Sequence, residues 1–398
     1  MQVAAPHVEK NIADVNFEIV GRCGERVWTK TVVAHLTSLL ESQGISPQSS
    51  STNPNRTGRS LIVRGDCYLD RSAVEVLLAS NSNCFIVAGD AQASRKTVEL
   101  IAAICKAEDH DVVRNLIDNP HTELSKLPSR TDFIYADAPP TVYDYELRKT
   151  SVPFVRKVTA ASVPEIERRT FDLAYKGVTD VVTKYVYPWP AFQATRLAAH
   201  AGIAPNAVTF VSLLCVFGVM ALFADGQFAP GLALGFTMSF LDTLDGKLAR
   251  VTQTSSRFGK HFDHLIDMIH PPFWWAAWWL GVAQNSQASS IEDAAIISTV
   301  GYVAIRLQEW RFKLRFGVRI HVWKPFDSKF RLITSRRNPN LLLLSAAVMI
   351  GEPAMGLLWV AGWTVASFAI HGVRWVQAEV EQSRNGPLHS WLESSPAS

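Results

Sequence analysis

Four aspartates in two pairs, Asp242 with Asp245 and Asp263 with Asp267, have the type and spacing best suited to chemistry in this sequence. A spacing of three or four residues places both members of a pair on one face of a helix, one turn apart. Two helices joined by a short polar, basic connection would bring the four carboxylates into one small volume. Carboxylates this close cannot all stay ionised unless cations share the space, and Mg²⁺ and Mn²⁺ suit oxygen ligands. The spacing therefore predicts a divalent-metal site of the kind that handles phosphates.

The surroundings of these aspartates distinguish them from solvated surface residues at helix ends. The first pair ends one apolar run and the second pair opens another, and ionisable residues bordering such runs mark functional sites. Gly246 and Gly259 leave the backbone bare, which allows close approach by a phosphate or a base. Arg250 projects from the same helix face as Gly246 and offers a guanidinium to phosphate oxygens.

Eight residues in this stretch also resemble a known family signature. The pattern DxxDGxxAR, eight residues, GxxxDxxxD is matched by Asp242, Asp245, Gly246, Ala249, Arg250, Gly259, Asp263 and Asp267. This is the signature of the CDP-alcohol phosphotransferases, the membrane enzymes that make phospholipid headgroups. A PNxxT segment beginning at Pro205, preceded by an amphipathic stretch, is similar to the same family. The resemblance covers roughly residues 176–376.

The resemblance implies that an alcohol displaces CMP from a CDP-linked donor. It implies two divalent ions, Mg²⁺ or Mn²⁺, with metal ligands at Asp242, Asp245, Asp263 and Asp267. Asp267 acts in this scheme as the general base toward the acceptor hydroxyl, and Asp263 is grouped with it as a catalytic residue. Contacts to the CDP-linked substrate are expected at Gly246, Ala249, Arg250 and Gly259. The family also implies six transmembrane helices, a polar cavity that faces the cytosol, and a homodimer.

Composition divides the 398 residues into two unlike halves. Residues 1–200 read as an ordinary soluble sequence, whereas residues 206–376 are a series of apolar runs rich in Trp, Phe and Leu. Neither half has the basic and aromatic clustering typical of nucleic-acid binding, so no nucleic-acid partner is expected. The five cysteines lack CxxC spacing, which predicts reduced thiols. The first residues lack a signal-peptide pattern, so we expect the soluble half to stay in the cytosol.

Residues 1–160 alternate strand-like and helix-like runs, which predicts an α/β domain with a mostly parallel sheet. Asp66, at the end of an expected strand, resembles the metal-binding aspartate of sugar-phosphate nucleotidyltransferases, a domain that some CDP-alcohol phosphotransferases carry in front. Residues 20–28 lack the glycine-rich basic loop of active members, and no second metal acid stands out near Asp132 or Asp137. We therefore expect an inactive nucleotidyltransferase-like domain, with Asp66 as a turn residue. A bifunctional enzyme whose first domain makes the CDP-alcohol is the alternative.

The remaining chain is expected to form a linker with an amphipathic juxtamembrane helix (161–205), an all-α six-helix transmembrane domain (206–378) and a cytosolic tail (379–398). The six candidate helices are Asn206–Phe223, Pro230–Arg250, Phe262–Val282, Ala294–Lys313, Asn338–Gly351 and Ala354–Val376. Loops 251–261 and 314–337 are basic, while the opposite loops have no Lys or Arg. The positive-inside rule therefore predicts a multi-pass protein with both termini and the aspartates on the cytosolic side. The WWAAWW stretch (274–279) is interpreted as lipid-facing or packing surface.

Three histidines near the aspartates allow a second metal hypothesis. His261, His264 and His270 could bind zinc together with Asp263. Four carboxylates and diphosphate chemistry favour harder ions, so we interpret these histidines as interfacial residues.

Charged residues elsewhere also have two interpretations. Arg306 and Glu309 pair with each other, or Arg306 faces the cavity and binds an acidic acceptor. The best candidates for a second phosphate contact are Arg336 and Arg337, although a headgroup-binding face explains that basic loop as well. Two further charged residues, Lys176 and Asp180, are either site residues or surface charges, and we favour surface charges.

The substrate pair stays open at this level. The donor is CDP-diacylglycerol with a polar acceptor, or a soluble CDP-alcohol with a lipid acceptor, and the basic residues favour a phosphorylated acceptor. A catalytically inactive, lipid-binding scaffold is the rival function, which the intact aspartates argue against.

Overall fold

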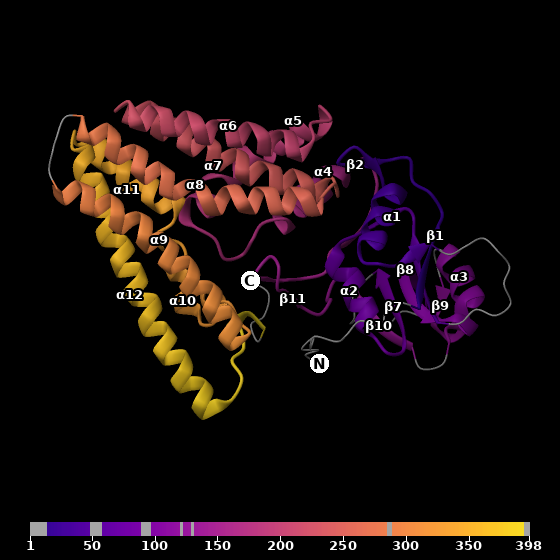
Figure 1. Cartoon of the computed structure of the whole chain (residues 1–398). Coiled ribbons are helices and arrows are strands. Elements are labelled where there is room, and N and C mark those ends of the chain that lie inside the picture. The colour runs from indigo at the N-terminus through magenta and orange to yellow at the C-terminus, as the bar shows by residue number, and fades with distance from the viewer. Residues whose placement is uncertain are drawn as a thin grey trace. The chain divides into compact units, whose positions relative to one another are not determined.

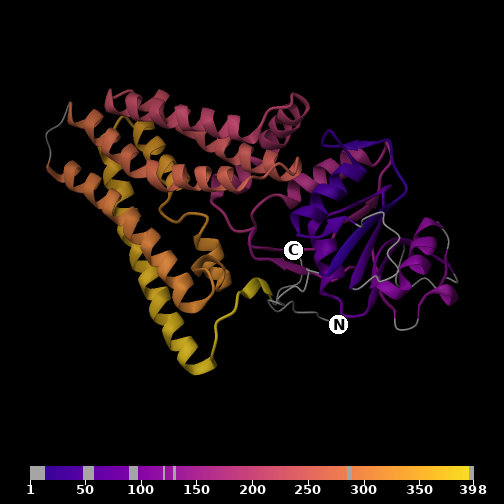
Figure 2. The same ribbon diagram turned by 45° about the vertical axis from the view of Figure 1, so that its right-hand side comes forward.

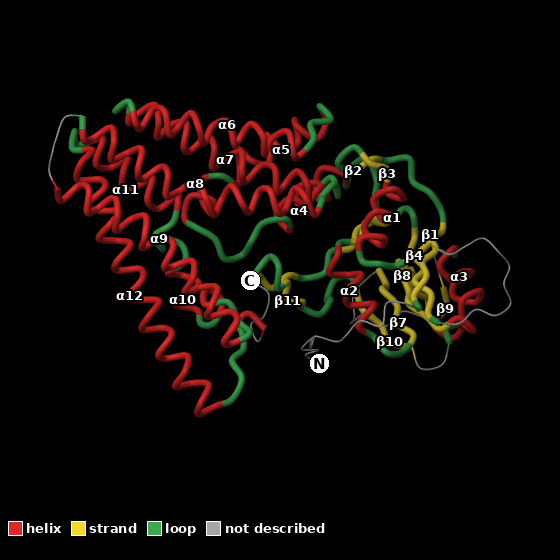
Figure 3. Tube along the Cα trace, in the orientation of Figure 1, coloured by secondary structure: helices red, strands yellow, loops and turns green. Residues whose placement is uncertain are grey.

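The computed structural model describes residues 14–47, 58–88, 97–119, 122–128, 131–284 and 289–393. Contacts divide the chain into two units. Among the described residues, unit 1 runs to Tyr175 and also contains Val251–Gln253, and unit 2 contains Lys176–Arg250 and residues 254–393. The described strands belong to unit 1, and unit 2 is built from helices (Figure 3).

Unit 1 is organised around one mixed sheet. Its strands lie in the order β10 (Thr131–Tyr135), β7 (Asn83–Ala88), β8 (Thr97–Lys106), β5 (Arg59–Arg64), β1 (Val15–Val20) and β4 (Ser46–Pro47), and β9 (Thr122–Glu123) pairs with β8. Strands β10, β7, β5, β1 and β4 run in one direction, and β8 runs antiparallel to both of its neighbours. The sheet is therefore mostly parallel, as predicted, and β8 is the strand of this path that makes it mixed.

Helices cover both faces of this sheet. Leu61, Ile62 and Val63 in the middle of β5 are all fully buried, as expected for a strand with no solvated face. Helices α1 (Val32–Ser42) and α2 (Arg71–Ala79) lie on one side of the sheet and α3 (His110–Asp118) on the other (Figures 1 and 2). The N-termini of α1 and α2 are capped by the side chains of Thr31 and Asp70.

Short elements complete unit 1. The paired strands are β2 (Arg26–Val27) with β3 (Lys30–Thr31), β6 (Cys67–Leu69) with β13 (Val155–Lys157), and β11 (Val142–Asp144) with β12 (Lys149–Ser151), and two 3₁₀ turns are η1 (Ala107–Asp109) and η2 (Leu124–Lys126). Helix α4 (Val163–Leu173) also belongs to this unit. Trp28 donates its backbone N–H to Glu167 Oε1 (3.1 Å) and its indole N–H to Thr170 Oγ1 (2.6 Å). These two bonds hold α4 against the strand β2.

Unit 2 places a helix at each of the six predicted positions. These helices are α6 (Pro205–Ala224), α7 (Phe228–Val251), α8 (Arg257–Ala283), α9 (Ser289–Phe316), α11 (Arg337–Met349) and α12 (Pro353–Asn385). Shorter segments are η3 (Val182–Val186), α5 (Pro188–His200), η4 (Ile320–Val322), α10 (Pro325–Phe330) and η5 (Trp391–Glu393). Helix α5 covers the predicted amphipathic juxtamembrane stretch.

The core of unit 2 is built on the tryptophan-rich stretch of α8. Trp274, Trp275 and Trp278 are fully buried, together with Phe223 of α6 and Leu341 of α11. The indole N–H of Trp278 donates to the Pro353 carbonyl at the start of α12 (3.0 Å). Residues 274–279 were interpreted as a lipid-facing or a packing surface, and these three tryptophans pack in the core.

Among the described helices, α6 and α12 are long and apolar enough to cross a bilayer. Helices α7, α8 and α9 carry charged residues, and the 13 residues of α11 span about 20 Å, less than the ~30 Å hydrocarbon core. Large apolar side chains are nevertheless exposed on α6 and α9, among them Phe210, Phe217, Val300, Leu307 and Trp310. Six helices thus form, and six membrane crossings stay a prediction.

Candidate active site

Helices α7 and α8 bring the four signature aspartates together. Asp242 and Asp245 lie on α7, and Asp263 and Asp267 lie on α8. Asp242 interacts electrostatically with Asp263 and Asp267, and Asp245 interacts with Asp242 and Asp267. The connection between the helices is fixed at both ends. The Thr254 N–H donates to the carbonyl of Ala249 in α7, and the Ser256 side chain caps the N-terminus of α8. The predicted clustering of the carboxylates is therefore present in the fold.

Arg337 of α11 lies between two of these carboxylates. Its Nη2 is 2.7 Å from Asp242 Oδ2, and its Nη1 is 2.6 Å from Asp267 Oδ1. In the structure Arg337 pairs with the carboxylates of α7 and α8, and its predicted phosphate contact stays a prediction. A buried guanidinium in this position partly neutralises the cluster and links three helices.

Asp245 is the most deeply buried carboxylate of the four, at 4% exposure. Its Oδ2 accepts a hydrogen bond from Thr209 Oγ1 near the start of α6 (2.5 Å). Its Oδ1 is buried and has no hydrogen-bond partner among the described residues. A buried, ionised oxygen without a partner is costly, and a cation bound by neighbouring carboxylates would satisfy it. The donor set therefore fits a hard divalent ion.

The two signature glycines permit close contacts. A β-carbon at Gly259 would lie 2.7 Å from Asn206 Oδ1, so glycine lets the first turn of α8 approach α6. A β-carbon at Gly246 would lie 3.1 Å from Arg250 Nη2, so glycine leaves room for the Arg250 guanidinium along α7. Ala249 is half-buried, and its carbonyl receives the bond that holds the α7–α8 connection. These glycines have packing roles in addition to the predicted substrate contacts.

The backbone of Asp267 has an unusual partner because Pro271 follows it in α8. Proline has no N–H, so the Asp267 carbonyl receives no helical hydrogen bond from residue 271. The hydroxyl of Tyr302 on α9 donates to this carbonyl instead (3.1 Å). The same hydroxyl accepts hydrogen bonds from Arg306 Nε (3.3 Å) and Nη2 (3.2 Å). Tyr302 thus connects Arg306 to the segment that presents the Asp267 carboxylate.

A second buried polar cluster surrounds Glu309 of α9. Ligand atoms of Glu309, His321 and His371 lie within 4.8 Å of one another, a spacing that a metal ion could use. Arg306 and Arg336, however, both pair with Glu309 Oε2, and Arg336 Nη2 also lies 3.3 Å from His321 Nε2. Two guanidinium groups on one carboxylate make the cluster unfavourable for another cation. The predicted Arg306–Glu309 pair is confirmed, and Arg336 shares it.

The zinc hypothesis for the three histidines of α8 is not supported. His261 and His264 are exposed, whereas His270 is buried and its Nδ1 bonds the Ile266 carbonyl (2.7 Å). Their side chains therefore have different surroundings, and His270 has a partner within its own helix.

The interpretation of Asp180 as a surface charge is wrong. Asp180 is 8% exposed and accepts hydrogen bonds from Asn338 Nδ2 (2.9 Å) and the Thr183 N–H (3.0 Å). Lys176 is exposed, as expected. Sequence reasoning missed the burial because Asn338 is 158 residues away in the chain.

Asp66 of unit 1 lies in the turn between β5 and β6, as predicted. Arg64 binds both of its carboxylate oxygens, with Nε–Oδ1 and Nη2–Oδ2 distances of 2.9 and 2.6 Å. Arg64 Nη1 also pairs with Glu99 (2.6 Å). Although burial opposes ionisation, this contact with Arg64 lowers the pKa of Asp66 below its ordinary value. A carboxylate bound at both oxygens is a poor candidate for a metal ligand.

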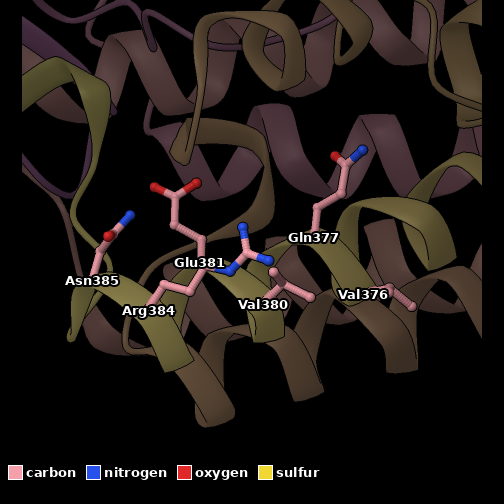
Figure 4. Close-up of a pocket in the computed structure, with 6 residues that line it drawn as sticks. All are labelled: Val376, Gln377, Val380, Glu381, Arg384 and Asn385. Atoms are coloured by element: carbon pink, nitrogen blue, oxygen red, sulfur yellow. The ribbon is translucent and has the colours of Figure 1, made fainter.

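A surface pocket of about 300 Å³ lies along the last turns of α12. It is lined by Val376, Gln377, Val380, Glu381, Arg384 and Asn385, whose side chains project from this one helix (Figure 4). Its lining contains none of the signature carboxylates, so the candidate active site is assigned from the polar clusters instead.

Three residues that the structure places at the site had no assigned role in the sequence: Thr209, Tyr302 and Asn338. Thr209 belongs to the PNxxT segment, which was noted only as a resemblance. Tyr302 lies four residues before Arg306, so helical spacing could have suggested that they meet. Asn338 follows Arg337 directly but carries no signal of burial.

Comparison with known proteins agrees with the signature. Residues 202–328 match the family model of the CDP-alcohol phosphatidyltransferases. The chain is 40% identical over 67 residues to the CDP-diacylglycerol–serine O-phosphatidyltransferase of Helicobacter pylori, covering 16% of this chain and 27% of that protein. It is 33% identical over 81 residues to the archaetidylinositol phosphate synthase of Pyrococcus horikoshii, covering 20% and 43%. The matches thus span less than half the length of these curated relatives.

Among solved structures, Mycobacterium tuberculosis phosphatidylinositol phosphate synthase (PgsA1) with CDP-DAG bound is similar, at 18% identity and a TM-score of 0.39. That match covers 52% of this chain and 97% of the synthase. The family match carries the identification, because all eight signature residues lie within it. Residues 202–328 therefore form a domain of the CDP-alcohol phosphatidyltransferase family.

Proposed function

We propose that this protein transfers a substituted phosphate group from a CDP-linked donor to an alcohol and releases CMP, in phospholipid biosynthesis. The observation that carries the proposal is the intact signature, whose four carboxylates cluster while Asp245 Oδ1 has no hydrogen-bond partner in the part of the chain that the structure describes. CDP-diacylglycerol is the donor we favour, because it appears in the name of the Helicobacter pylori relative. An inactive scaffold would have no need of a buried carboxylate with one oxygen left unsatisfied by the described residues.

Metal dependence follows from the same carboxylates. Asp242, Asp245, Asp263 and Asp267 would hold two divalent ions, Mg²⁺ or Mn²⁺. When bound, such ions neutralise the donor diphosphate and stabilise the charge that develops on the leaving CMP. Gly246, Ala249 and Arg250 would then border the CDP portion of the donor, with the guanidinium contacting a phosphate oxygen.

Asp267 is the proposed general base. Its side chain is 37% exposed, against 15% for Asp242, so an acceptor hydroxyl can reach it more easily. The hydroxyl proton passes to Asp267 as the acceptor oxygen bonds to the β-phosphorus of the donor. The bond from this phosphorus to the bridging oxygen breaks, and CMP leaves with the electron pair.

The acceptor class we favour is a phosphorylated alcohol. Arg306 and Arg336 share the single carboxylate of Glu309, so this group of three keeps a net positive charge of about one. Tyr302 connects Arg306 to the backbone of Asp267, which places this charge beside the proposed base. Arginine guanidinium groups suit phosphate recognition, because they can donate two parallel hydrogen bonds.

We further propose a multi-pass membrane protein, a homodimer, with both termini cytosolic. Exposed apolar side chains on α6 and α9 support contact with lipid.

For unit 1 we propose a nucleotidyltransferase-like domain without catalysis, supported by the Arg64 contacts to Asp66. The bifunctional alternative requires CTP-dependent release of pyrophosphate by the full chain. If the Asp66→Asn variant still released pyrophosphate, Asp66 would not be the catalytic residue of that activity.

The first experiment is CMP release by purified protein in detergent with Mg²⁺ or Mn²⁺. CDP-diacylglycerol would be tested with phosphorylated and unphosphorylated alcohols. Asp267→Asn should abolish turnover and leave donor binding partly intact, whereas Asp225→Asn, at an exposed aspartate after α6, serves as the matched control. Undiminished turnover of Asp267→Asn contradicts the assigned base. Silence of the wild-type protein with every donor and acceptor favours the scaffold function.

Acceptor recognition is tested with Arg306→Gln. This change should raise the KM for a phosphorylated acceptor at least tenfold and leave the KM for the donor unchanged, because it removes about one charge-assisted contact. Equal increases in both KM values would contradict a role specific to the acceptor.

A further inference from the structure

The backbone that carries Arg336 and Arg337 is held on both sides by buried polar side chains. Before it, the Ser335 N–H donates to Ser367 Oγ (3.1 Å), and Ser335 Oγ bonds Thr364 Oγ1 (2.8 Å). After it, Asn338 is 3% exposed. Such networks in an apolar core fix one arrangement, because each broken bond leaves a buried group unsatisfied.

Asn338 bonds partners on two other segments of unit 2. Its Nδ2 donates to Asp180 Oδ1 (2.9 Å), and its Oδ1 accepts from Ser239 Oγ on α7 (2.6 Å). Ser239 is fully buried and lies three residues before Asp242. The amide therefore ties the first turn of α11 to the part of α7 that carries the first signature aspartate.

Asp180 is the charged end of this chain of contacts. It also accepts from the Thr183 N–H (3.0 Å) and Thr183 Oγ1 (2.9 Å). Burial opposes its ionisation, but the positive charge of Arg331 and these hydrogen bonds keep the pKa of Asp180 below its ordinary value. The negative charge of Asp180 also acts on Arg337, whose guanidinium bridges the carboxylates of α7 and α8.

We propose that Asp180 is a positioning residue for the transfer reaction, acting through Asn338 to hold the Arg337 guanidinium between the carboxylates of α7 and α8. This inference rests on the proposed function. With Asp180 in place, Arg337 keeps Asp242 and Asp267 apart and partly neutralised until substrate binds. Without it, the first turn of α11 loses its anchor and Arg337 loses its fixed position.

A double-mutant cycle in the full-length protein tests this role. Asp180→Asn should lower kcat for CMP release by about tenfold or more, because a small displacement of a reacting group is costly. It should also tighten Mn²⁺ binding to the substrate-free protein several-fold, because a competing positive charge leaves the carboxylates. In the Arg337→Gln background, the same substitution should change neither quantity by more than about twofold.

The controls separate positioning from general stability. Ser239→Ala removes one hydroxyl from the network and should shift Mn²⁺ affinity in the same direction with little loss of Tm, while Asp225→Asn should change nothing. Equal effects of Asp180→Asn in both backgrounds, or weaker Mn²⁺ binding together with a lower Tm, would overturn the proposal. Absence of CMP release from the wild-type protein would refute the proposed function, whereas the Mn²⁺ cycle would still decide the role of Asp180.

Discussion

The Tyr302 hydroxyl provides the cleanest test of how the site is assembled, because Tyr302→Phe removes a single oxygen. That oxygen donates to the Asp267 carbonyl, which Pro271 leaves without a helical partner, and it accepts from Arg306. Tyr302 is 4% exposed, so water replaces the lost group poorly. Leaving a buried carbonyl unsatisfied costs about 1–3 kcal/mol. At about 2–4 °C per kcal/mol for a unit of this size, Tm should fall by several degrees.

Turnover should fall as well, because the Asp267 segment and Arg306 lose their connection. We expect a decrease in kcat/KM of about tenfold, corresponding to about 1.4 kcal/mol of transition-state stabilisation. Thermal unfolding in detergent and CMP release would be measured on the same preparations. Tyr185→Phe, at an exposed tyrosine, is the matched control. If Tyr302→Phe had wild-type Tm and kcat/KM, the hydroxyl bridge would have no role in positioning Asp267.

Two further predictions concern packing and pH. Gly259→Ala should destabilise unit 2 by about 1 kcal/mol, because its β-carbon would lie 2.7 Å from Asn206 Oδ1. At Gly362 of α12 a β-carbon meets open space, so Gly362→Ala should leave Tm unchanged or raise it, because alanine favours a helix more than glycine does. A Tm of Gly259→Ala equal to that of Gly362→Ala in thermal unfolding would contradict this. Burial lowers the pKa of His35 to about 3, so the unfolded chain binds a proton below about pH 6.5 that the folded unit does not. Unit 1 should therefore lose up to about 2 kcal/mol between pH 6.5 and 5, seen as faster hydrogen exchange in α1, and His35→Gln should remove this dependence. Exchange that is independent of pH, after correction for intrinsic rates, would contradict it.

The helices of unit 2 could be placed from the sequence because their ends carry local signals. The second expected helix, Pro230–Arg250, corresponds to α7 at Phe228–Val251, and the third, Phe262–Val282, corresponds to α8 at Arg257–Ala283. Apolar runs interrupted by short polar connections fix such boundaries within a few residues. Membrane crossing was harder to assign, because hydropathy alone does not separate a charged functional helix from a charged surface helix.

The sequence of unit 1 indicated its layers but not its sheet direction at every strand. Alternating strand and helix patterns predict parallel pairing, and β1, β5, β7 and β10 follow that rule. Strand β8 lies between β5 and β7 and runs antiparallel to both. The place and direction of β8 depend on which strand edges of the sheet are left unpaired by the other strands, and the local sequence of β8 does not contain that information.

The sequence by itself determined which carboxylates form the candidate site, because helical periodicity places Asp242 with Asp245 and Asp263 with Asp267 whatever the rest of the fold does. Only the tertiary structure decided their partners. Arg337 meets Asp267 across 70 residues and Asp242 across 95, and Asp180 meets Asn338 across 158. These contacts depend on how separate helices pack, and a buried charge takes whichever partner that packing brings within hydrogen-bond distance.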